Sequence, residues 1–229
     1  MYFDPMYFLF IIPPFLLSLL ASFLTKKNFN RYSKVRVSTG LTGAQAAAEM
    51  LRRSGLNDVE IKPSRGFLSD HYNPVNKTLN LSPAVYQTPS IAAVGVACHE
   101  AGHAIQHATG YKALGLRSAL VPTANIGSKF GYFIMLGGLF LASSKMVLVG
   151  AVLFAAVVLF QLITLPVEFD ASARAKRLVV EYGLVGHGEE LGVAKVLNAA
   201  ALTYVAAAAS SIMTLLYFLL RAGLLGGRD

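Results

Sequence analysis

Two histidines and a glutamate stand at a spacing that suits metal-dependent hydrolysis. They form an HExxH motif, His99-Glu100-Ala101-Gly102-His103. On an α-helix, side chains four residues apart lie on one face about 6 Å apart, so both imidazoles can reach one Zn²⁺ at about 2.1 Å. Glu100 borders the same face, where it can accept a proton from a reacting water without being a ligand. The motif therefore predicts a catalytic zinc site held by His99 and His103, with Glu100 as general base.

A catalytic zinc usually has three protein ligands and one open position. Two nearby residues are poor candidates for the third ligand. His107 continues the row of histidines, but it lies about 12 Å from His99 along a helix axis, so we interpret it as a supporting or merely polar residue. Cys98 is rotated by about 100° from His99 around the helix, which favours a small packed residue. The third ligand must therefore come from another segment.

Glu168 is our candidate for the third ligand. It follows an apolar stretch, and a hairpin of two membrane-spanning helices would return it to the side of the membrane where the motif lies. Pro166 fits the start of a new helix over residues 168–182, closed by Gly183. Two alternatives stay open: Glu168 could complement a positive helix N-terminus, or Asp170 could be the ligand. Asp170 and Ser172 could also orient a ligand histidine.

Peptide hydrolysis forms a tetrahedral oxyanion that needs a donor besides the metal. His71, His187 and Tyr204 are the candidates. Each also has a simpler interpretation, because the two histidines could be polar turn residues near Pro or Gly, and tyrosine is common at membrane interfaces. We predict that Glu100, His71 and Tyr204 are catalytic residues, and that Zn²⁺ is held by the residues named above, His99, His103 and Glu168.

The composition indicates a membrane protein. Of 229 residues, 55% are hydrophobic and only 14% are charged, which is too apolar for an ordinary soluble domain. The formal net charge is +8, but the sequence has no phosphate-cradling glycine loop and no basic patch interleaved with aromatics, so we expect no nucleic-acid partner. A single cysteine excludes an intrachain disulfide. The lipid bilayer is the expected environment.

Four apolar stretches approach the roughly 20 residues needed to cross a bilayer. The first carries two adjacent prolines, which membrane helices tolerate, and it is followed rather than preceded by Lys26 and Lys27, unlike a signal peptide. The second is interrupted in its first half by Pro122, Asn125 and Lys129. The predicted spans are residues 6–24, 119–143, 146–165 and 199–220.

The distribution of charge predicts the topology. Residues 25–118 contain 12 Lys and Arg against 5 Asp and Glu, so this segment should stay in the cytoplasm. Residues 166–198 then return to the cytoplasm, and both termini lie outside. The predicted organisation is a first span in 1–24, a cytoplasmic catalytic region in 25–118, two spans in 119–165, a cytoplasmic helical region with the third ligand in 166–198, and a last span with a short tail in 199–229.

The predicted catalytic region combines helices with a small sheet. Thr42 and Gln45 match a capping box at the start of a helix over residues 42–54, and Gly55 supplies its stop. Residues 59–62, 66–71 and 77–81 have the pattern of strands, with turn residues between the last two. Thr88 followed by Pro89 indicates the start of the helix that carries the HExxH motif and ends near residue 108, before Gly110.

Four stretches together resemble a known family, the bacterial membrane zinc metallopeptidases of the YugP type, and more distantly the HtpX and Ste24 peptidases. They are Ser69-Asp70-His71-Tyr72-Asn73-Pro74, Cys98-His99-Glu100-Ala101-Gly102-His103, Pro166-Val167-Glu168-Phe169-Asp170-Ala171-Ser172 and Ala201-Leu202-Thr203-Tyr204-Val205. In the HtpX-like relatives an aspartate follows the glutamate ligand by four residues, and Ser172 stands in that place here.

The resemblance implies a gluzincin-like catalytic core on the cytoplasmic side of the bacterial plasma membrane. We therefore predict a mainly α integral membrane protein with about four transmembrane helices and a small α+β, zincin-like catalytic region. The predicted activity is zinc metalloendopeptidase action on a peptide or protein substrate. The alternative is a non-catalytic membrane scaffold with a structural zinc, although such a site has no need of Glu100 and usually closes with four protein ligands.

Overall fold

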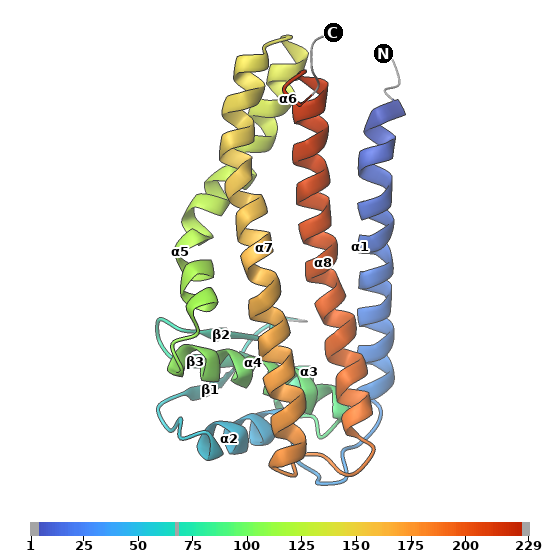
Figure 1. Cartoon of the computed structure of the whole chain (residues 1–229). Helices are drawn as coiled ribbons and strands as arrows, with labels where there is room; N and C mark the ends of the chain where they lie inside the picture. The colour runs from blue at the N-terminus through green and yellow to red at the C-terminus, as the bar shows by residue number, and fades with distance from the viewer. Residues whose placement is uncertain (1–4, 67–68, 226–229) are drawn as a thin grey trace. The chain divides into compact units, whose positions relative to one another are not determined.

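The computed structural model describes residues 5–66 and 69–225, and the chain is mainly helical. It divides into two compact units that are each discontinuous in sequence. Figure 1 shows the helices and strands, coloured along the chain. The first unit consists of Met1–Leu20, Gly115–Pro166 and Thr203–Asp229, and the second of Ala21–Leu114 and Val167–Leu202. Three long helices, α1 (Pro5–Tyr32), α7 (Ser144–Glu181) and α8 (Glu190–Arg221), contribute residues to both units.

The first unit is built from helices that pack through small residues and aromatic rings. Besides parts of α1, α7 and α8, it contains most of α5 (Lys112–Ile126), the π-helix η1 (Gly127–Gly131) and α6 (Tyr132–Phe140). A Cβ added at Gly138 would lie 2.7 Å from the backbone nitrogen of Val147, and one at Gly150 would lie 2.6 Å from that of Met135. The α6 and α7 backbones thus approach as closely as small residues allow in membrane helix pairs.

Within the part of the chain that the structure describes, three helices are long and apolar enough to cross a membrane, by length and composition: α1, α7 and α8. The fourth predicted span, residues 119–143, is divided among α5, η1 and α6. Pro122 lies inside α5, and the π-helical turn contains Lys129. Each of the three pieces is shorter than a bilayer-spanning helix, so a fourth crossing stays a prediction.

The predicted helix start at Pro166 is wrong. Residues 146–165 and 168–182 were expected as separate helices, but α7 runs without a break from Ser144 to Glu181 with Pro166 inside it. A proline removes only one N–H donor, and neighbouring side chains can compensate the local backbone. Glu168 therefore lies on the continuation of an apolar helix, and Gly183 ends that helix region with a positive φ of 60°.

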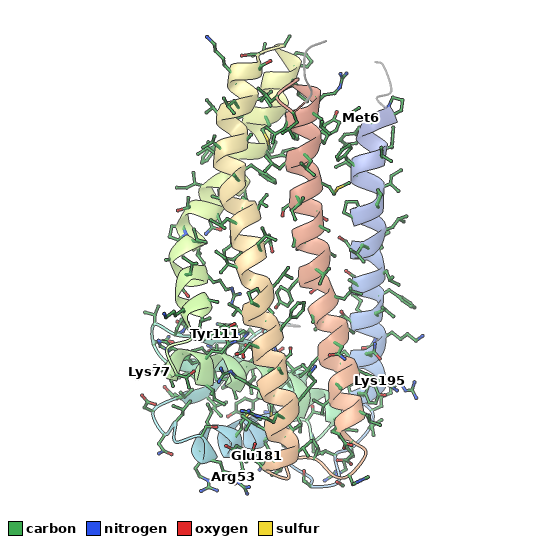
Figure 2. The ribbon with its side chains drawn as sticks, in the orientation of Figure 1. Met6, Arg53, Lys77, Tyr111, Glu181 and Lys195 are labelled. Carbon is green, nitrogen blue, oxygen red and sulfur yellow. The ribbon has the colours of Figure 1, made fainter. Side chains whose placement is uncertain are left out.

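In the second unit, the capping box and the glycine stop predicted from the sequence bound a helix. In α2 (Gly43–Arg53) the Thr42 side chain accepts from the Gln45 backbone, and the Gln45 side chain accepts from the Thr42 backbone, so the predicted capping box is confirmed. Gly55 has a φ of +75°, as its predicted role as helix stop requires. Arg53, which is labelled in Figure 2, lies at the other end of α2. Its guanidinium lies 5.5 Å from the ring centre of Tyr182, next to the end of α7.

A three-stranded sheet lies against α4 in the second unit. The order is β1 (Glu60–Pro63), β3 (Thr78–Leu81), β2 (His71–Asn73), with β1 parallel and β2 antiparallel to β3. The predicted strand over residues 66–71 is wrong, because β2 only begins at its last residue. Gly66 has a φ of +107°, and Asp70 accepts from the Ser82 backbone at 2.7 Å, so the described residues just before His71 are not part of a strand. Residues 67 and 68 of that prediction lie outside the described part.

The helix that carries the HExxH motif is α4 (Ile91–Ala108). It starts three residues later than predicted, because the Ser90 side chain, rather than the Thr88-Pro89 pair, caps it by accepting from the Ala93 backbone. The short helix α3 (Pro83–Tyr86) precedes it. The predicted end is confirmed, since Gly110 has a φ of +63° just beyond Ala108. Fourteen of its residues are buried, so α4 is the central element of this unit.

Candidate metal centre

The structure brings the three predicted ligands together. One potential ligand atom each of His99, His103 and Glu168 lies within 4.8 Å of the others, and all three residues belong to the second unit. Glu168 Oε2 lies 3.2 Å from His99 Nε2 and 3.5 Å from His103 Nε2. Among the residues that the structure describes, this is the one such group of three or more His, Cys, Asp and Glu side chains. Asp170, the rival ligand, is not part of it.

The distances and the donor chemistry fit a zinc ion. Two ligand atoms of a tetrahedral zinc with bonds of 2.0–2.1 Å are about 3.4 Å apart, which matches the two separations from Glu168. A carboxylate can only accept hydrogen bonds, so each Nε2 facing it needs either a proton or a shared cation. Burial opposes a charge on His103, but hydrogen bonding to Glu168 and the charges of Glu100 and Glu168 outweigh it and raise the pKa of His103 above its ordinary value. The site is thus built for positive charge.

Close packing of α4 against α7 places Glu168 beside the HExxH motif. A Cβ added at Gly102, inside the motif, would lie 2.7 Å from the carbonyl oxygen of Ala171 on α7. No residue with a side chain can sit there without separating the backbones, since real Cβ contacts essentially never fall below 3.0 Å. The glycine between the two histidines therefore allows the α4 and α7 backbones to touch. This contact places Glu168, one turn before Ala171, beside both imidazoles.

Each ligand histidine is held from behind by a hydrogen bond to Nδ1. The Ser172 hydroxyl lies 3.0 Å from His99 Nδ1, and the Gln106 amide oxygen lies 2.9 Å from His103 Nδ1. Metal-binding histidines usually have such a partner on the second ring nitrogen, which orients the ring. Ser172 thus makes the contact that the sequence suggested for it. Asp170 acts at one remove, because its carboxylate accepts from Gln106 Nε2 at 2.8 Å.

Glu100 lies beside the cluster rather than within it. The residue is only 9% exposed, and its carboxylate accepts a hydrogen bond of 3.0 Å from the backbone N–H of Tyr72 in β2. A backbone donor on a strand of the sheet is a fixed point, so the carboxylate has a defined position one helical turn back from His103. This is the placement that a general base needs, close to the metal ligands but not consumed by the metal.

The three candidates for the oxyanion donor come from three different parts of the chain. His71 is exposed in β2, and its ring nitrogens face the Ser69 carbonyl at 2.8 Å and the Asn80 amide at 3.3 Å. Tyr204 lies on α8 in the first unit, and His187 is exposed in the loop after α7. The roles of these residues in stabilising an oxyanion stay predictions.

Two neighbours of the motif meet the interpretations given from sequence. His107 is not one of the residues of the metal group. Its Nδ1 lies 2.9 Å from the Tyr72 hydroxyl. Tyr72 and His107 together line a small cavity of about 170 Å³ between β2 and the end of α4. Cys98 is fully buried in the hydrophobic core of the second unit, and burial raises the pKa of its thiol. It is a packed residue, as predicted.

Sequence reasoning missed two contributors. Gln106 is completely buried and contacts a ligand histidine, and the Tyr72 backbone fixes Glu100. Gln106 carried a signal that could have been used, since it is a polar residue three positions after His103 in a helix of Ala, Ile and Gly, and i and i+3 side chains are neighbours. The contribution of Tyr72 had no such signal, because it comes from a backbone group whose position depends on the sheet register.

The fold and the site define a mainly helical protein with candidate membrane spans and a His-His-Glu group that could hold a metal ion. The chain belongs to the family described as "Putative neutral zinc metallopeptidase", whose sequence profile matches residues 7–223. A protein of Bacillus subtilis (strain 168) named "Putative membrane protease YugP" is 50% identical over 213 residues, which cover 93% of this chain and 94% of that protein. No solved structure matches the chain. The two names agree on proteolysis, and the family's name adds zinc while the relative's name adds a membrane.

Proposed function

We propose that the protein is a membrane-embedded zinc metalloendopeptidase with a gluzincin-like centre, in which His99, His103 and Glu168 hold the metal. The observation that carries the proposal is the convergence of these three side chains, with Glu100 fixed beside them by a backbone hydrogen bond. Two imidazoles and one carboxylate leave a fourth position of a tetrahedral zinc for the reaction. A structural site would instead be closed by a fourth protein ligand.

A bound zinc would supply Lewis-acid chemistry, lowering the pKa of a water molecule and polarising the scissile carbonyl. The chain's own residues perform the proton transfers. Glu100 accepts the proton of the attacking water and later gives it to the leaving amine. The hydrogen bond from the Tyr72 backbone holds the carboxylate in place during both transfers. His71 and Tyr204 are the proposed donors to the oxyanion.

We further propose that an extended peptide binds along β2. This strand is at an edge of the sheet, whereas β3 is its central strand. The Tyr72 N–H points to Glu100 and therefore away from β3, and in an antiparallel strand the C=O of the same residue points the same way. A substrate segment can donate to this carbonyl and so lie next to Glu100.

The proposed location is the bacterial plasma membrane, with the metal centre on the cytoplasmic side. The excess of 12 Lys and Arg over 5 Asp and Glu in residues 25–118 supports this orientation, because positive charge favours the cytoplasmic side. In this topology residues 119–143 make a fourth crossing in addition to those of α1, α7 and α8. The substrate is a peptide or protein, and one associated with the membrane would reach the site without leaving the bilayer surface.

The substitution Glu100→Gln tests the catalytic proposal. The amide keeps the size of the side chain but cannot accept the proton, so we expect zinc to remain bound while casein hydrolysis falls at least about 100-fold, the lower range of a general base. Metal content of the purified full chain is measured alongside activity. Wild-type turnover by this variant would remove Glu100 as base. A wild type that binds zinc without hydrolysing any peptide would favour the second candidate, a non-catalytic zinc-binding scaffold.

A further inference from the structure

Gln106 is the most completely buried polar side chain next to the metal centre. Its exposed fraction is 0%, and its amide makes three hydrogen bonds: Oε1 faces His103 Nδ1 at 2.9 Å, and Nε2 donates to the Val167 carbonyl and to the Asp170 carboxylate, both at 2.8 Å. A buried polar group of this kind is costly unless all its hydrogen bonds are made. Gln106 uses both N–H donors and its carbonyl, so the site holds this amide without an unmet donor.

The partners of the amide nitrogen determine which way the amide points. The Val167 carbonyl and the Asp170 carboxylate can only accept hydrogen bonds, and Asp170 also accepts from Arg174 Nε at 2.6 Å. The NH₂ group of Gln106 must therefore face them, because the opposite orientation would set oxygen against oxygen twice. Gln106 Oε1 is consequently directed at His103, where it can only accept.

The orientation of the amide determines the tautomer of His103. Because Oε1 accepts, Nδ1 of His103 must carry the proton, and the lone pair of a neutral ring then lies on Nε2. Nε2 is the atom that faces Glu168 Oε2 at 3.5 Å, in the metal group. Ser172 cannot impose the same choice on His99, since a hydroxyl can either donate or accept. The two ligand histidines are therefore controlled to different degrees.

We propose that Gln106 is a positioning residue for the metal, which fixes His103 as an Nε2 ligand and locks it to α7. Two of its hydrogen bonds support this role, since their acceptors, Val167 and Asp170, flank Glu168 on α7. Arg174, one turn further on, in turn holds Asp170. Gln106 thus ties one ligand to the helix of another through a path that bypasses the metal. The motif of this chain is accordingly His99-Glu100-x-x-His103-x-x-Gln106. The inference rests on the proposed zinc site but not on proteolysis.

The test measures zinc affinity of the full chain in detergent by chelator competition, independently of activity. Gln106→Met keeps the length of the side chain but removes its hydrogen bonds, and Gln106→Asn keeps an amide that is too short to join His103 to α7. We expect both variants to bind zinc about 10- to 100-fold more weakly, the usual effect of losing a partner behind a ligand histidine. The visible absorption of cobalt-substituted protein should also change, because His103 is no longer held in one orientation.

Ser90→Ala is the matched control. Ser90 is buried and caps the same helix α4, but it contacts Ala93 rather than a ligand. This variant should lower the unfolding temperature and leave zinc affinity and the cobalt spectrum unchanged. If the Gln106→Met and Gln106→Asn variants fold and keep the wild-type zinc affinity and cobalt spectrum, the role of Gln106 is overturned while the metal centre itself stands. A wild type without stoichiometric zinc would overturn the metal centre and this assignment together, whereas loss of peptidase activity with intact zinc binding contradicts only the proposed function.

Discussion

Replacing Gly102 by alanine would insert one methyl group where α4 and α7 touch. The added Cβ would lie 2.7 Å from the Ala171 carbonyl oxygen, while ordinary contacts begin at 3.4 Å, so the backbones must separate by up to 0.7 Å. Metal sites tolerate errors of only about 0.2 Å in ligand distance. Because His99 and His103 lie on one of these helices and Glu168 on the other, the separation acts directly on the ligand geometry.

We expect Gly102→Ala to weaken zinc binding by at least about 10-fold, as losses of support around a metal commonly do. Its effect on the free energy of unfolding should be smaller, because overpacking costs about 1–3 kcal/mol and the better helix propensity of alanine returns about 1 kcal/mol. The assay is the zinc dissociation constant by chelator competition, with thermal unfolding of the metal-free protein measured in parallel.

The matched control is Gly115→Ala on α5, where an added Cβ meets nothing within 4 Å. It should leave zinc binding unchanged and stabilise the protein by up to about 1 kcal/mol. If folded Gly102→Ala binds zinc as tightly as the wild type, then the close contact at Ala171 does not set the position of Glu168, and our explanation of the site is wrong.

Three further perturbations have defined outcomes. Thr42→Ala removes the side chain that caps α2 and should cost about 1 kcal/mol of stability; an unchanged unfolding temperature would contradict this. Burial raises the pKa of Asp70 although Ser82 hydrogen bonds oppose it, so its carboxyl favours the fold below its ordinary pKa and loses this contribution as pH rises through the raised pKa. Asparagine at position 70 can still accept from Ser82, whereas Asp70→Ala leaves the Ser82 donors without a partner at a cost of about 1–3 kcal/mol. At pH 7, Asp70→Asn should consequently unfold at a higher temperature than Asp70→Ala; equal temperatures would contradict the role of Asp70 as acceptor. The raised pKa of His103 means that protons compete with zinc from above its ordinary pKa of 6.5, so zinc affinity should fall as pH drops through this range; a dissociation constant that is the same at about pH 8 and pH 6 would exclude this competition.

Local signals in the sequence predicted the parts of the fold that depend on a few neighbouring residues. The capping box of Thr42 and Gln45 and the helix ends at Gly55 and Gly110 are of this kind, since each depends on hydrogen bonds or dihedral angles within one turn. The convergence of His99, His103 and Glu168 was also anticipated, because two ligands share a helical face and the third follows from a helical hairpin.

Features that depend on tertiary context were not predictable in the same way. The helix break expected at Pro166 does not occur, because an apolar helix already formed by residues 144–165 continues past a single missing donor. The strand expected over residues 66–71 is present only at His71, and the described residues before it include Asp70, which accepts from Ser82, twelve positions away. The role of Gln106 was not predicted, because it depends on hydrogen bonds to α7 residues that lie more than sixty positions along the chain.

X-ray absorption at the zinc edge of the purified full chain tests the metal centre most directly. We predict one zinc per chain with nitrogen and oxygen neighbours at about 2.0–2.2 Å, the imidazole scattering of two histidines and no sulfur. His103→Ala and Glu168→Ala should each remove one neighbour or abolish binding. A sulfur neighbour at about 2.3 Å, which would implicate Cys98, or zinc retained unchanged after loss of Glu168, would contradict the account.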